Sequence, residues 1–384
     1  MERTPIRYGY VVMNKWVRKD LREYIPYNAT AKPAKIILDA NESPWNLPEE
    51  VRQDMLDWFT YEEDLNRYPD TDCIELREAI ATMWNCDLTK ENIVCGVGSD
   101  QLIDYITKAI LSPGDAVVTT TPSFSMYGLT AKLNHGHVAA FPLEAGTEFR
   151  LDHDADAFIA FAKENNAKLA FLCTPNNPTG QTIQKPTLMK IVKALDCPVV
   201  VDEAYGEFTH HGMQSIPNKI ENVIYDRPTM IPWVNEYPNV IVLRTFSKAY
   251  GLAGARIGYS VSHVELAKAL NIVRAPYNVP TVSQKLALSV LRHRVVYERR
   301  LSYIRSMEQE LAAIDGIRVY ESEANFVYFE TEMNVSDALE AAGIRVRVFQ
   351  RGEKEKIRLS YGTEEQKQAV LAVIHACAGK RGEQ

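Results

Sequence analysis

The middle of the chain alternates short apolar runs with amphipathic stretches, a pattern typical of β–α–β units in a largely parallel sheet. Each run is continuously apolar, as expected for strands that helices cover on both faces. The runs that we predict to be strands are ENIVCG (91–96), DAVVTTT (115–121), KLAFLCT (168–174), CPVVVDE (197–203) and NVIVLRT (239–245).

The pattern changes after Val282. We predict one long helix from Gln284 to Ile314, ended by Gly316, because its apolar residues recur at helical spacings of three and four. The remaining segments predict a smaller α+β domain, namely strands at IRVYESE and NFVYFET, a helix near 335–342, and strands at IRVRVFQ and KIRLSYG. The first forty or so residues contain no helix long enough to stand alone, which favours an arm packed on the rest.

The length of the chain indicates more than one domain, because 384 residues exceed what a single hydrophobic core usually spans. We expect an α/β fold in which residues 46–282 form a large domain with a mostly parallel sheet flanked by helices. Residues 283–384 would form the small α+β domain. Residues 1–45 would be an N-terminal arm that also contributes to the small domain.

The composition is that of an ordinary soluble globular protein, with 46% apolar and 24% charged residues. A net charge of -7 argues against a nucleic-acid surface, although it leaves room for a local anion pocket. The N-terminus lacks the apolar stretch of a signal peptide, and no run approaches the roughly 18 apolar residues of a membrane span. We therefore expect a cytoplasmic protein with neither membrane nor nucleic acid as a partner.

The cysteines and histidines do not indicate a metal site. No two of the six cysteines share a CxxC spacing, which favours buried, reduced thiols. The histidine clusters at 135–137 and 210–211 match no metal-binding spacing, so we expect no metal.

Candidate chemistry follows the predicted strands, because ligands of an open α/β sheet bind beyond the carboxyl ends of its strands. These positions supply a glycine turn, an aromatic ring, an amide, a carboxylate and a lysine. Pyridoxal 5'-phosphate (PLP), an aromatic phosphorylated aldehyde, requires this combination. The segments that supply it are 96–100, 122–127, 174–180, 202–205 and 244–256.

Lys248, Asp202 and Tyr205 are the candidate catalytic residues. A desolvated amine at Lys248, between a buried strand and a glycine-rich segment, would be nucleophilic and would condense with the PLP aldehyde. A single loop lysine is far more often a solvated charge. Asp202 would keep the pyridine nitrogen protonated. Taken alone, Asp202 is equally compatible with capping of the next loop.

The cofactor phosphate would bind at Gly98, Ser99 and Asp100, which lead into a helix whose N-terminal N–H groups attract anions. The turn is also a partial dinucleotide fingerprint, but it lacks the third glycine, which weakens the alternative of an NAD-dependent dehydrogenase. Ser247 would add a hydroxyl group, and Arg256 would add a forked positive charge.

Three further residues would contact the cofactor ring. Phe124 would stack on it, and Asn177 and Tyr205 would hydrogen-bond its phenolic oxygen. Each has an ordinary alternative: a core aromatic, a turn residue before proline, and half-buried packing, respectively.

Three sequence blocks, in this order, resemble those of the class I/II aminotransferases: CTPNNPTG (173–180), VVDEAY (200–205), and Ser247-Lys248 with Gly251, Gly254, Arg256 and Gly258. The resemblance covers nearly the whole chain. It implies PLP fold type I and a homodimer with shared active sites at the subunit interface. It also implies ping-pong transfer of an amino group from a small-molecule donor to a 2-oxo acid.

Within that family, the histidinol-phosphate aminotransferases are the most similar, by segments that include LDANESP (38–44), LNRYPD (65–70), APYNV (275–279) and IRLSYGT (357–363). This resemblance implies L-histidinol phosphate and 2-oxoglutarate as substrates. It implies that Tyr68 reaches the cofactor phosphate of the partner subunit, and that Asn41, Arg347 and Arg358 bind substrate. Arg345 shares a strand face with Arg347, and we interpret it as an exposed edge-strand residue.

Two alternatives on the same fold remain open. One is an aminotransferase for aromatic amino acids, in which Phe124, Tyr127 and the arm residues Tyr24 and Tyr27 would serve the substrate ring. The other is an amino-acid phosphate decarboxylase. An apparent insertion near 212–233 could reshape the mouth of the pocket and so bears on the substrate.

Overall fold

The computed structural model describes residues 16–22, 33–209, 229–301 and 307–381. Expectations for Tyr24, Tyr27, the histidines at 210–211 and most of the 212–233 insertion lie outside these residues. The chain divides into two units, 1–34 and 35–384. In the first unit, the described residues form one 3-10 turn, η2 (Lys19–Leu21). The packing of the predicted arm and the predicted domain boundaries stay predictions.

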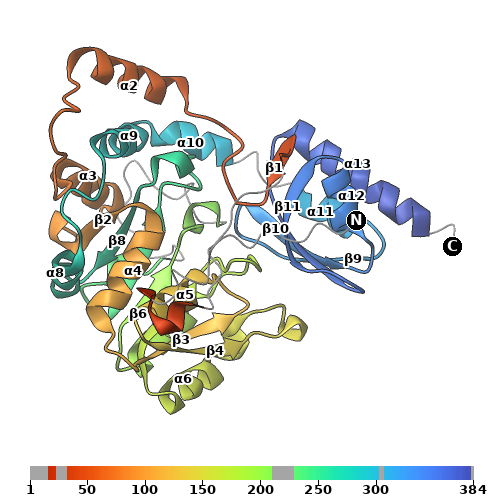
Figure 1. Ribbon diagram of the computed structural model, residues 1–384, viewed down its shortest axis with the longest axis horizontal. Helices are drawn as coiled ribbons and strands as arrows, with labels where there is room; N and C mark the ends of the chain where they lie inside the picture. Colours follow the sequence, from red (N-terminus) through yellow and green to blue (C-terminus); the bar gives the residue numbers. More distant parts are fainter. Residues whose placement is uncertain (1–15, 23–32, 210–228, 302–306, 382–384) are drawn as a thin grey trace. The chain divides into compact units, whose positions relative to one another are not determined.

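The larger sheet has seven strands in the order β2-β8-β7-β6-β5-β3-β4. The run from β4 to β7 is parallel, whereas β8 is antiparallel to both β7 and β2. The mostly parallel sheet is therefore confirmed (Figure 1). The strands are β2 (Ile93–Gly96), β3 (Ala116–Thr121), β4 (His137–Pro142), β5 (Ala167–Cys173), β6 (Val199–Asp202), β7 (Val240–Thr245) and β8 (Gly258–Ser262).

All five predicted strands are present, as β2, β3, β5, β6 and β7, and the sequence analysis missed β4 and β8. β4 is an edge strand of half-buried and exposed residues, and two alanines, which are uncommon in strands, lie at the centre of its sequence HVAAFP. β8 is fully buried but carries Ser260 and Ser262, which made it look like part of a glycine-rich loop.

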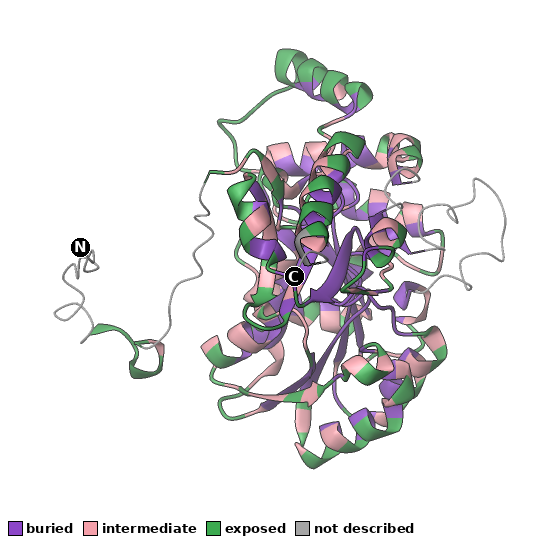
Figure 2. Ribbon diagram, turned by 90° about the vertical axis from the view of Figure 1, so that its right-hand side faces the viewer, coloured by how far each residue is buried: buried purple, intermediate pink, exposed green. Residues whose placement is uncertain are grey.

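Helices cover both faces of this sheet, as the continuously apolar strands predicted. Alternate strand residues enter two cores, with Val200, Ile241 and Leu243 in one and Val199, Val201, Val240 and Val242 in the other. Figure 2 shows the sheet buried between its helices. The first core is covered by α4 (Gly98–Ile110), α5 (Met126–Leu133) and α8 (Val264–Val273), and the second by α3 (Ile74–Trp84), α6 (Ala155–Glu164), α7 (Lys185–Ala194) and α9 (Thr281–Arg292).

The smaller sheet has five strands in the order β1-β11-β12-β10-β9, and β1 runs parallel to β11 while the other pairs are antiparallel. Figure 1 shows β1, from the N-terminal side of the chain, beside the C-terminal strands. The predicted α+β character of this part is confirmed. Its elements are β1 (Ile36–Leu38), β9 (Ile317–Tyr320), β10 (Phe326–Thr331), β11 (Ile344–Gln350), β12 (Glu355–Ser360), α12 (Val335–Ala341) and α13 (Glu364–Arg381).

The prediction of one helix from Gln284 to Ile314 is wrong. The chain forms α9, α10 (Arg294–Leu301) and α11 (Met307–Ala312), and the first break falls at His293. There the ring Nε2 of His293 lies 3.2 Å from Asp54 Oδ2 on α2 (Glu49–Tyr61). A contact with a residue so distant in sequence leaves no trace in helical periodicity.

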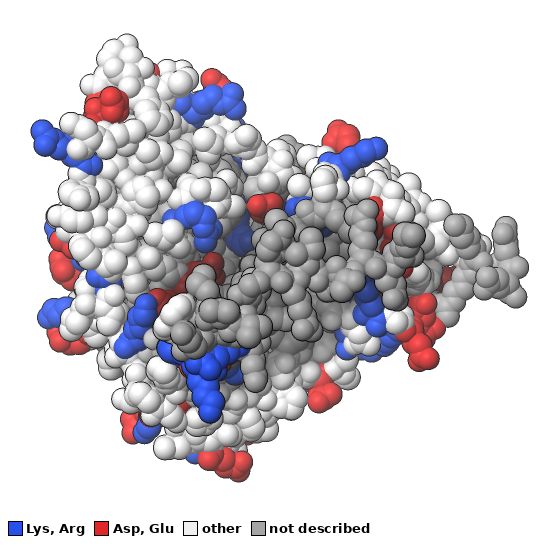
Figure 3. Space-filling view, in the orientation of Figure 1, with Lys and Arg blue, Asp and Glu red and all other residues white. Residues whose placement is uncertain are grey.

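The six cysteines are all free thiols. Among the described residues, no helix combines the length and apolarity needed to cross a bilayer. Acidic and basic side chains are interspersed over the face that Figure 3 shows, so neither sign dominates it.

Candidate active site

The carboxyl ends of β5, β6 and β7 lie side by side in the large sheet. Cys173 pairs with Asp202, and Asp202 pairs with Leu243 on the next strand. The segments that follow these strands therefore meet at one edge, as the sequence predicted, and they carry Asn177, Tyr205 and Lys248.

Asp202 is a buried carboxylate, only 3% exposed. The hydroxyl of Tyr127 donates to its Oδ2 at 2.6 Å, and the backbone N–H of Ala204 donates to its Oδ1 at 3.1 Å. Desolvation nevertheless raises the pKa of Asp202 to about 6. Among the described residues it makes no ion pair, so the site has a place for a cation, which the protonated ring nitrogen of PLP would supply.

Lys248 presents an activated amine. The side chain is half-buried, and its Nζ donates to the backbone oxygen of Ala40 at 2.7 Å. Desolvation, assisted by the nearby charge of Arg358, lowers the pKa of Lys248 to about 8. About one tenth of the amine is therefore neutral, and hence nucleophilic, at pH 7.

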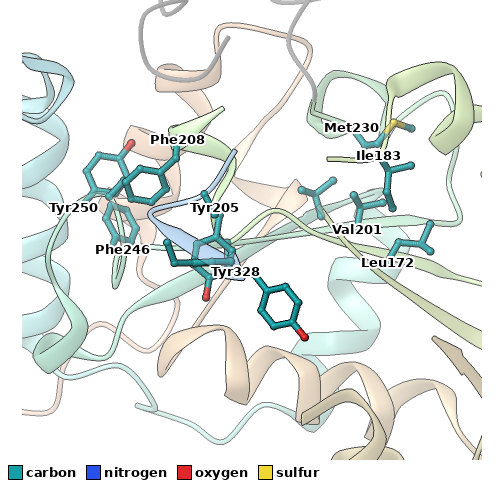
Figure 4. Close-up of a cluster of buried hydrophobic side chains, with 14 of the residues drawn as sticks. Leu172, Ile183, Val201, Tyr205, Phe208, Met230, Phe246, Tyr250 and Tyr328 are labelled. Carbon is teal, nitrogen blue, oxygen red and sulfur yellow. The ribbon is translucent and has the colours of Figure 1, made fainter. Parts of the chain in front are cut away.

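Tyr205 lies close to this amine, with Lys248 Nζ 5.9 Å from its ring centroid. Its ring belongs to the buried cluster of Figure 4 and packs edge-on against Phe326. Burial raises the pKa of Tyr205 to about 12, so its phenol stays protonated as a hydrogen-bond donor. Its oxygen accepts a hydrogen bond of 2.9 Å from Asn41 Nδ2.

Asn41 is buried in the left-handed region, with φ 54°. Its backbone N–H donates to Ser360 Oγ at 2.8 Å, and the Ser360 hydroxyl donates to its Oδ1 at 3.1 Å. Asn325 Nδ2 donates to its backbone oxygen at 3.0 Å. The structure thus places Asn41 as the anchor of Tyr205, while a direct contact with substrate stays a prediction.

The first turn of α4 forms a candidate phosphate cradle with Gly98, Ser99 and Asp100. Gly98 has φ +73°, and a Cβ there would lie 2.6 Å from Arg256 Nη2, so only glycine lets this guanidinium approach the helix N-terminus. Arg256 Nη1 lies 3.4 Å from Ser247 Oγ, and Nη2 lies 3.4 Å from Asp100 Oδ2. N–H groups, a hydroxyl and a partly exposed guanidinium fit a phosphate group.

Two arginines meet on the small sheet. Arg358 on β12 is buried and donates from Nη1 to Asn177 Oδ1 and from Nη2 to the backbone oxygen of Asp39, both at 2.5 Å. Arg347 on β11 is its register partner and is exposed, with its guanidinium over the ring of Phe349. Arg358 thus lies beside the segment that carries Asn177, and Arg347 is next to Arg358 across the pairing of β11 with β12.

Arg345 differs from our interpretation. It is half-buried, and its Nε lies 2.9 Å from Asp39 Oδ2, so it belongs to an ion pair and not to an exposed edge. The parallel pairing of β1 with β11 brings Asp39 into reach.

The two remaining aromatic candidates, Phe124 and Tyr68, each pack on another aromatic ring. Phe124 is half-buried and packs edge-on against Tyr127, with ring centroids 5.5 Å apart. Tyr68 is 81% exposed and stacks on Tyr277 at 4.5 Å. The roles predicted for both in cofactor binding stay predictions.

Sequence reasoning missed the partners that support these residues. Tyr127 was considered only as a substrate contact, yet it is fully buried and bonds Asp202. Ser360 and the backbone oxygens of Asp39 and Ala40 were not foreseen either. The only available signal was that Tyr127 lies in a segment that directly follows a predicted strand.

The full-length matches to known proteins agree with this geometry. The family model described as aminotransferase class I and II matches residues 33–374. A histidinol-phosphate aminotransferase of Ruminiclostridium cellulolyticum is 36% identical over 95% of this chain and 99% of its own length. Another, from Caldanaerobacter subterraneus subsp. tengcongensis, is 38% identical over 87% of this chain and 90% of its own.

The fold agrees as well. The crystal structure of histidinol-phosphate aminotransferase from Sinorhizobium meliloti in complex with pyridoxal-5'-phosphate superposes with a TM-score of 0.77 and 25% identity. The match covers 90% of this chain and 91% of that one. The predicted PLP fold type I architecture is thereby confirmed. With a lysine, a buried carboxylate and a candidate phosphate cradle after strands of its larger sheet, this chain belongs to the aminotransferase class I and II family.

Proposed function

We propose that this protein is a PLP-dependent aminotransferase that converts L-histidinol phosphate and 2-oxoglutarate to imidazole acetol phosphate and L-glutamate, a step of histidine biosynthesis. One observation carries the proposal. The amine of Lys248, with a pKa of about 8, lies at the same sheet edge as Asp202, a buried carboxylate without a cationic partner among the described residues. Relatives named histidinol-phosphate aminotransferase match nearly the full length of the chain.

The donor set fits PLP. Asp202 would face the ring nitrogen, Phe124 the ring, and Tyr205 and Asn177 the phenolic oxygen. The phosphate would lie at the N-terminus of α4, held by Gly98, Ser99, Asp100, Ser247 and Arg256. When bound, PLP supplies the electron sink that stabilises negative charge at the carbon bearing the substrate amine.

The residues of the chain have distinct tasks in this chemistry. Lys248 would bind the cofactor and, once the substrate amine replaces it, would take a proton from that carbon and deliver it to the former aldehyde carbon of the cofactor, because a pKa of about 8 suits a general base and acid near neutral pH. Asp202 would stay ionised beside the ring cation. Tyr205 would donate its phenolic proton without losing it, since burial raises its pKa to about 12.

The two arginines suit a pocket that must accept two different anions in turn. Histidinol phosphate ends in a phosphate and 2-oxoglutarate in a carboxylate, and guanidinium groups bind both in a forked geometry. Arg358 is held in place by Asn177 and Asp39, whereas the exposed Arg347 beside it would complete the anion pocket.

We propose in addition a homodimer in which Tyr68 reaches the cofactor phosphate of the partner subunit. Large apolar side chains are exposed on α2 and on the segments 65–74 and 272–277, an arrangement that favours contact with another protein surface. They are Leu56, Phe59, Tyr61, Leu65, Tyr68, Ile74, Ile272 and Tyr277. A single monomer peak in size-exclusion chromatography with light scattering would contradict the dimer.

We place the enzyme in the cytoplasm, where free thiols persist.

The near-visible absorbance spectrum of the purified protein tests the function. We expect a yellow band from bound PLP that converts to the pyridoxamine form when L-histidinol phosphate is added without an acceptor. Conversion by phenylalanine but not by histidinol phosphate would move the substrate to an aromatic amino acid. Release of carbon dioxide from an amino-acid phosphate would indicate a decarboxylase. A protein without such a band, even with added PLP, would refute the proposal.

A further inference from the structure

A buried ion cluster lies next to the proposed cofactor residues and has no part in the chemistry described above. Arg244 on β7 is 4% exposed, with Nη2 2.6 Å from Glu203 Oε2 and Nη1 3.1 Å from Glu207 Oε1. Both glutamates are buried, and the guanidinium lies over the ring of Trp84 at 4.9 Å. We call Arg244 with Glu203 and Glu207 the Arg244 fork.

Each part of the Arg244 fork is close in sequence to one proposed cofactor residue. Glu203 directly follows Asp202, and because successive side chains of an extended chain point to opposite sides, the fork and the cofactor would lie on opposite sides of this backbone. Glu207 lies two residues after Tyr205, on η6 (Gly206–Phe208). Arg244 lies four residues before Lys248.

The backbone is fitted closely around the guanidinium. A Cβ at Gly206 would clash with Arg244, so the DEAYGEF segment needs glycine at this position to let the fork form. Glu203 also accepts hydrogen bonds from the Thr229 hydroxyl at 2.7 Å and from the Met230 backbone N–H at 2.8 Å. The cluster thus joins three separate stretches of chain.

Stability alone explains this cluster poorly. Buried ion pairs repay their desolvation only with excellent geometry and complete hydrogen bonding. Here Arg244 Nε and Glu207 Oε2 are buried and find no hydrogen-bond partner among the described residues. What the fork does supply is a rigid, directional link between the strand ends that carry Asp202, Tyr205 and Lys248.

We propose that Arg244 is a positioning residue whose fork fixes the backbone next to Asp202 and Tyr205 relative to Lys248, so that all three face one cofactor. The proposal rests on the proposed PLP chemistry. Arg244 touches neither substrate nor cofactor. It acts through its two glutamates, and a lysine in its place would keep the charge but would lack the two-pronged geometry.

The test compares cofactor affinity with stability in Arg244→Lys, Glu207→Gln, the double variant and a control. The control is Glu355→Gln, because Glu355 is also buried and hydrogen-bonded, but it caps α12 on the small sheet through the backbone N–H groups of Val335 and Ser336. The PLP dissociation constant comes from absorbance titration at a temperature where circular dichroism shows each apoprotein folded. Thermal unfolding of the apoproteins gives stability.

We expect Arg244→Lys to weaken PLP binding about tenfold to 100-fold, the range that loss of an orienting partner costs at ligand sites such as metal centres. Glu207→Gln should weaken it less. The PLP dissociation constant of the double variant should equal that of Arg244→Lys, because both substitutions disrupt the same Arg244 fork. Glu355→Gln should lower only the unfolding temperature.

Wild-type PLP affinity in folded Arg244→Lys or, if that variant does not fold, in Glu207→Gln would overturn the positioning role. Fully additive effects in the double variant would do the same. These outcomes leave the proposed function intact, since the wild-type protein still binds PLP. A wild-type protein that binds no PLP would end the proposed function, and the role of the fork with it.

Discussion

Replacing Tyr127 by phenylalanine tests how Asp202 is kept ready for a cation. The Tyr127 hydroxyl donates to Asp202 Oδ2 at 2.6 Å inside the core. A hydrogen bond to a charged acceptor contributes about 1.5–3 kcal/mol and one to a neutral acceptor about 0.5–1.5 kcal/mol. Tyr127→Phe should therefore disfavour the ionised carboxylate by roughly 1–1.5 kcal/mol, which raises the pKa of Asp202 by about one unit from its value of about 6.

The consequence for PLP affinity depends on pH. Binding beside a ring cation requires ionised Asp202, which becomes scarcer in the variant as the pH falls through its raised pKa. The ratio of the variant and wild-type dissociation constants should be near one at pH 8 and about fivefold at pH 6, where half of wild-type Asp202 is ionised. Titrations of PLP itself and of Lys248 affect both proteins equally and cancel in this ratio.

The assay is an absorbance titration with PLP at a series of pH values. Tyr297→Phe is the matched control, because Tyr297 is also a buried tyrosine but its hydroxyl finds no hydrogen-bond partner among the described residues. For this control, the ratio of the variant and wild-type dissociation constants should stay near one at every pH. A ratio for Tyr127→Phe that stays constant across the series, whether at one or above it, would refute the reasoning.

Three further changes test other parts of the site. Lys248→Ala should abolish turnover. Lys268→Ala is the control, because that side chain is 69% exposed, and it should keep wild-type activity. Full activity of Lys248→Ala would exclude Lys248 as the catalytic amine. Gly98→Ala should destabilise the protein by about 1–2 kcal/mol and weaken PLP binding, because φ is +73° and the new Cβ would lie 2.6 Å from Arg256 Nη2. Thermal unfolding and PLP titration measure the two effects. Gly146→Ala is the control, because a Cβ there would lie in open space. Arg358→Lys should raise KM for both substrates about tenfold or more with little loss of kcat, because an ammonium group lacks the rigid, planar fork with which Arg358 contacts Asn177 and Asp39. Steady-state kinetics with an unchanged KM would contradict this role.

The sequence predicted best what depends on local pattern. The five buried parallel strands are continuous apolar runs, and chemistry at their carboxyl ends follows from the fold class. β8 was missed because its buried Ser260 and Ser262 are polar, and only pairing with β2 and β7 makes them strand residues. The ring of His293, at the break between α9 and α10, contacts Asp54, which is 239 residues away in sequence.

The supporting contacts of the site were missed for the same reason. Tyr127 and Asp202 are 75 residues apart, and Asn41 and Tyr205 are 164 apart, so no spacing in the chain announces either hydrogen bond. The identity of the candidate residues could be predicted because a cofactor demands particular groups. The hydrogen bonds between these residues could not be predicted, because many polar side chains could form them and only the packed fold determines which one does.

The three residues that follow β1 each hold a different site residue, so the site should not tolerate an insertion or deletion among them. The backbone oxygen of Asp39 holds Arg358, that of Ala40 holds Lys248, and the side chain of Asn41 holds Tyr205. Deletion of one residue here would shift every contact by one position, and because β1 is fixed in register on β11, the strand could not slide to compensate. Homologous proteins should therefore keep the length of this stretch constant.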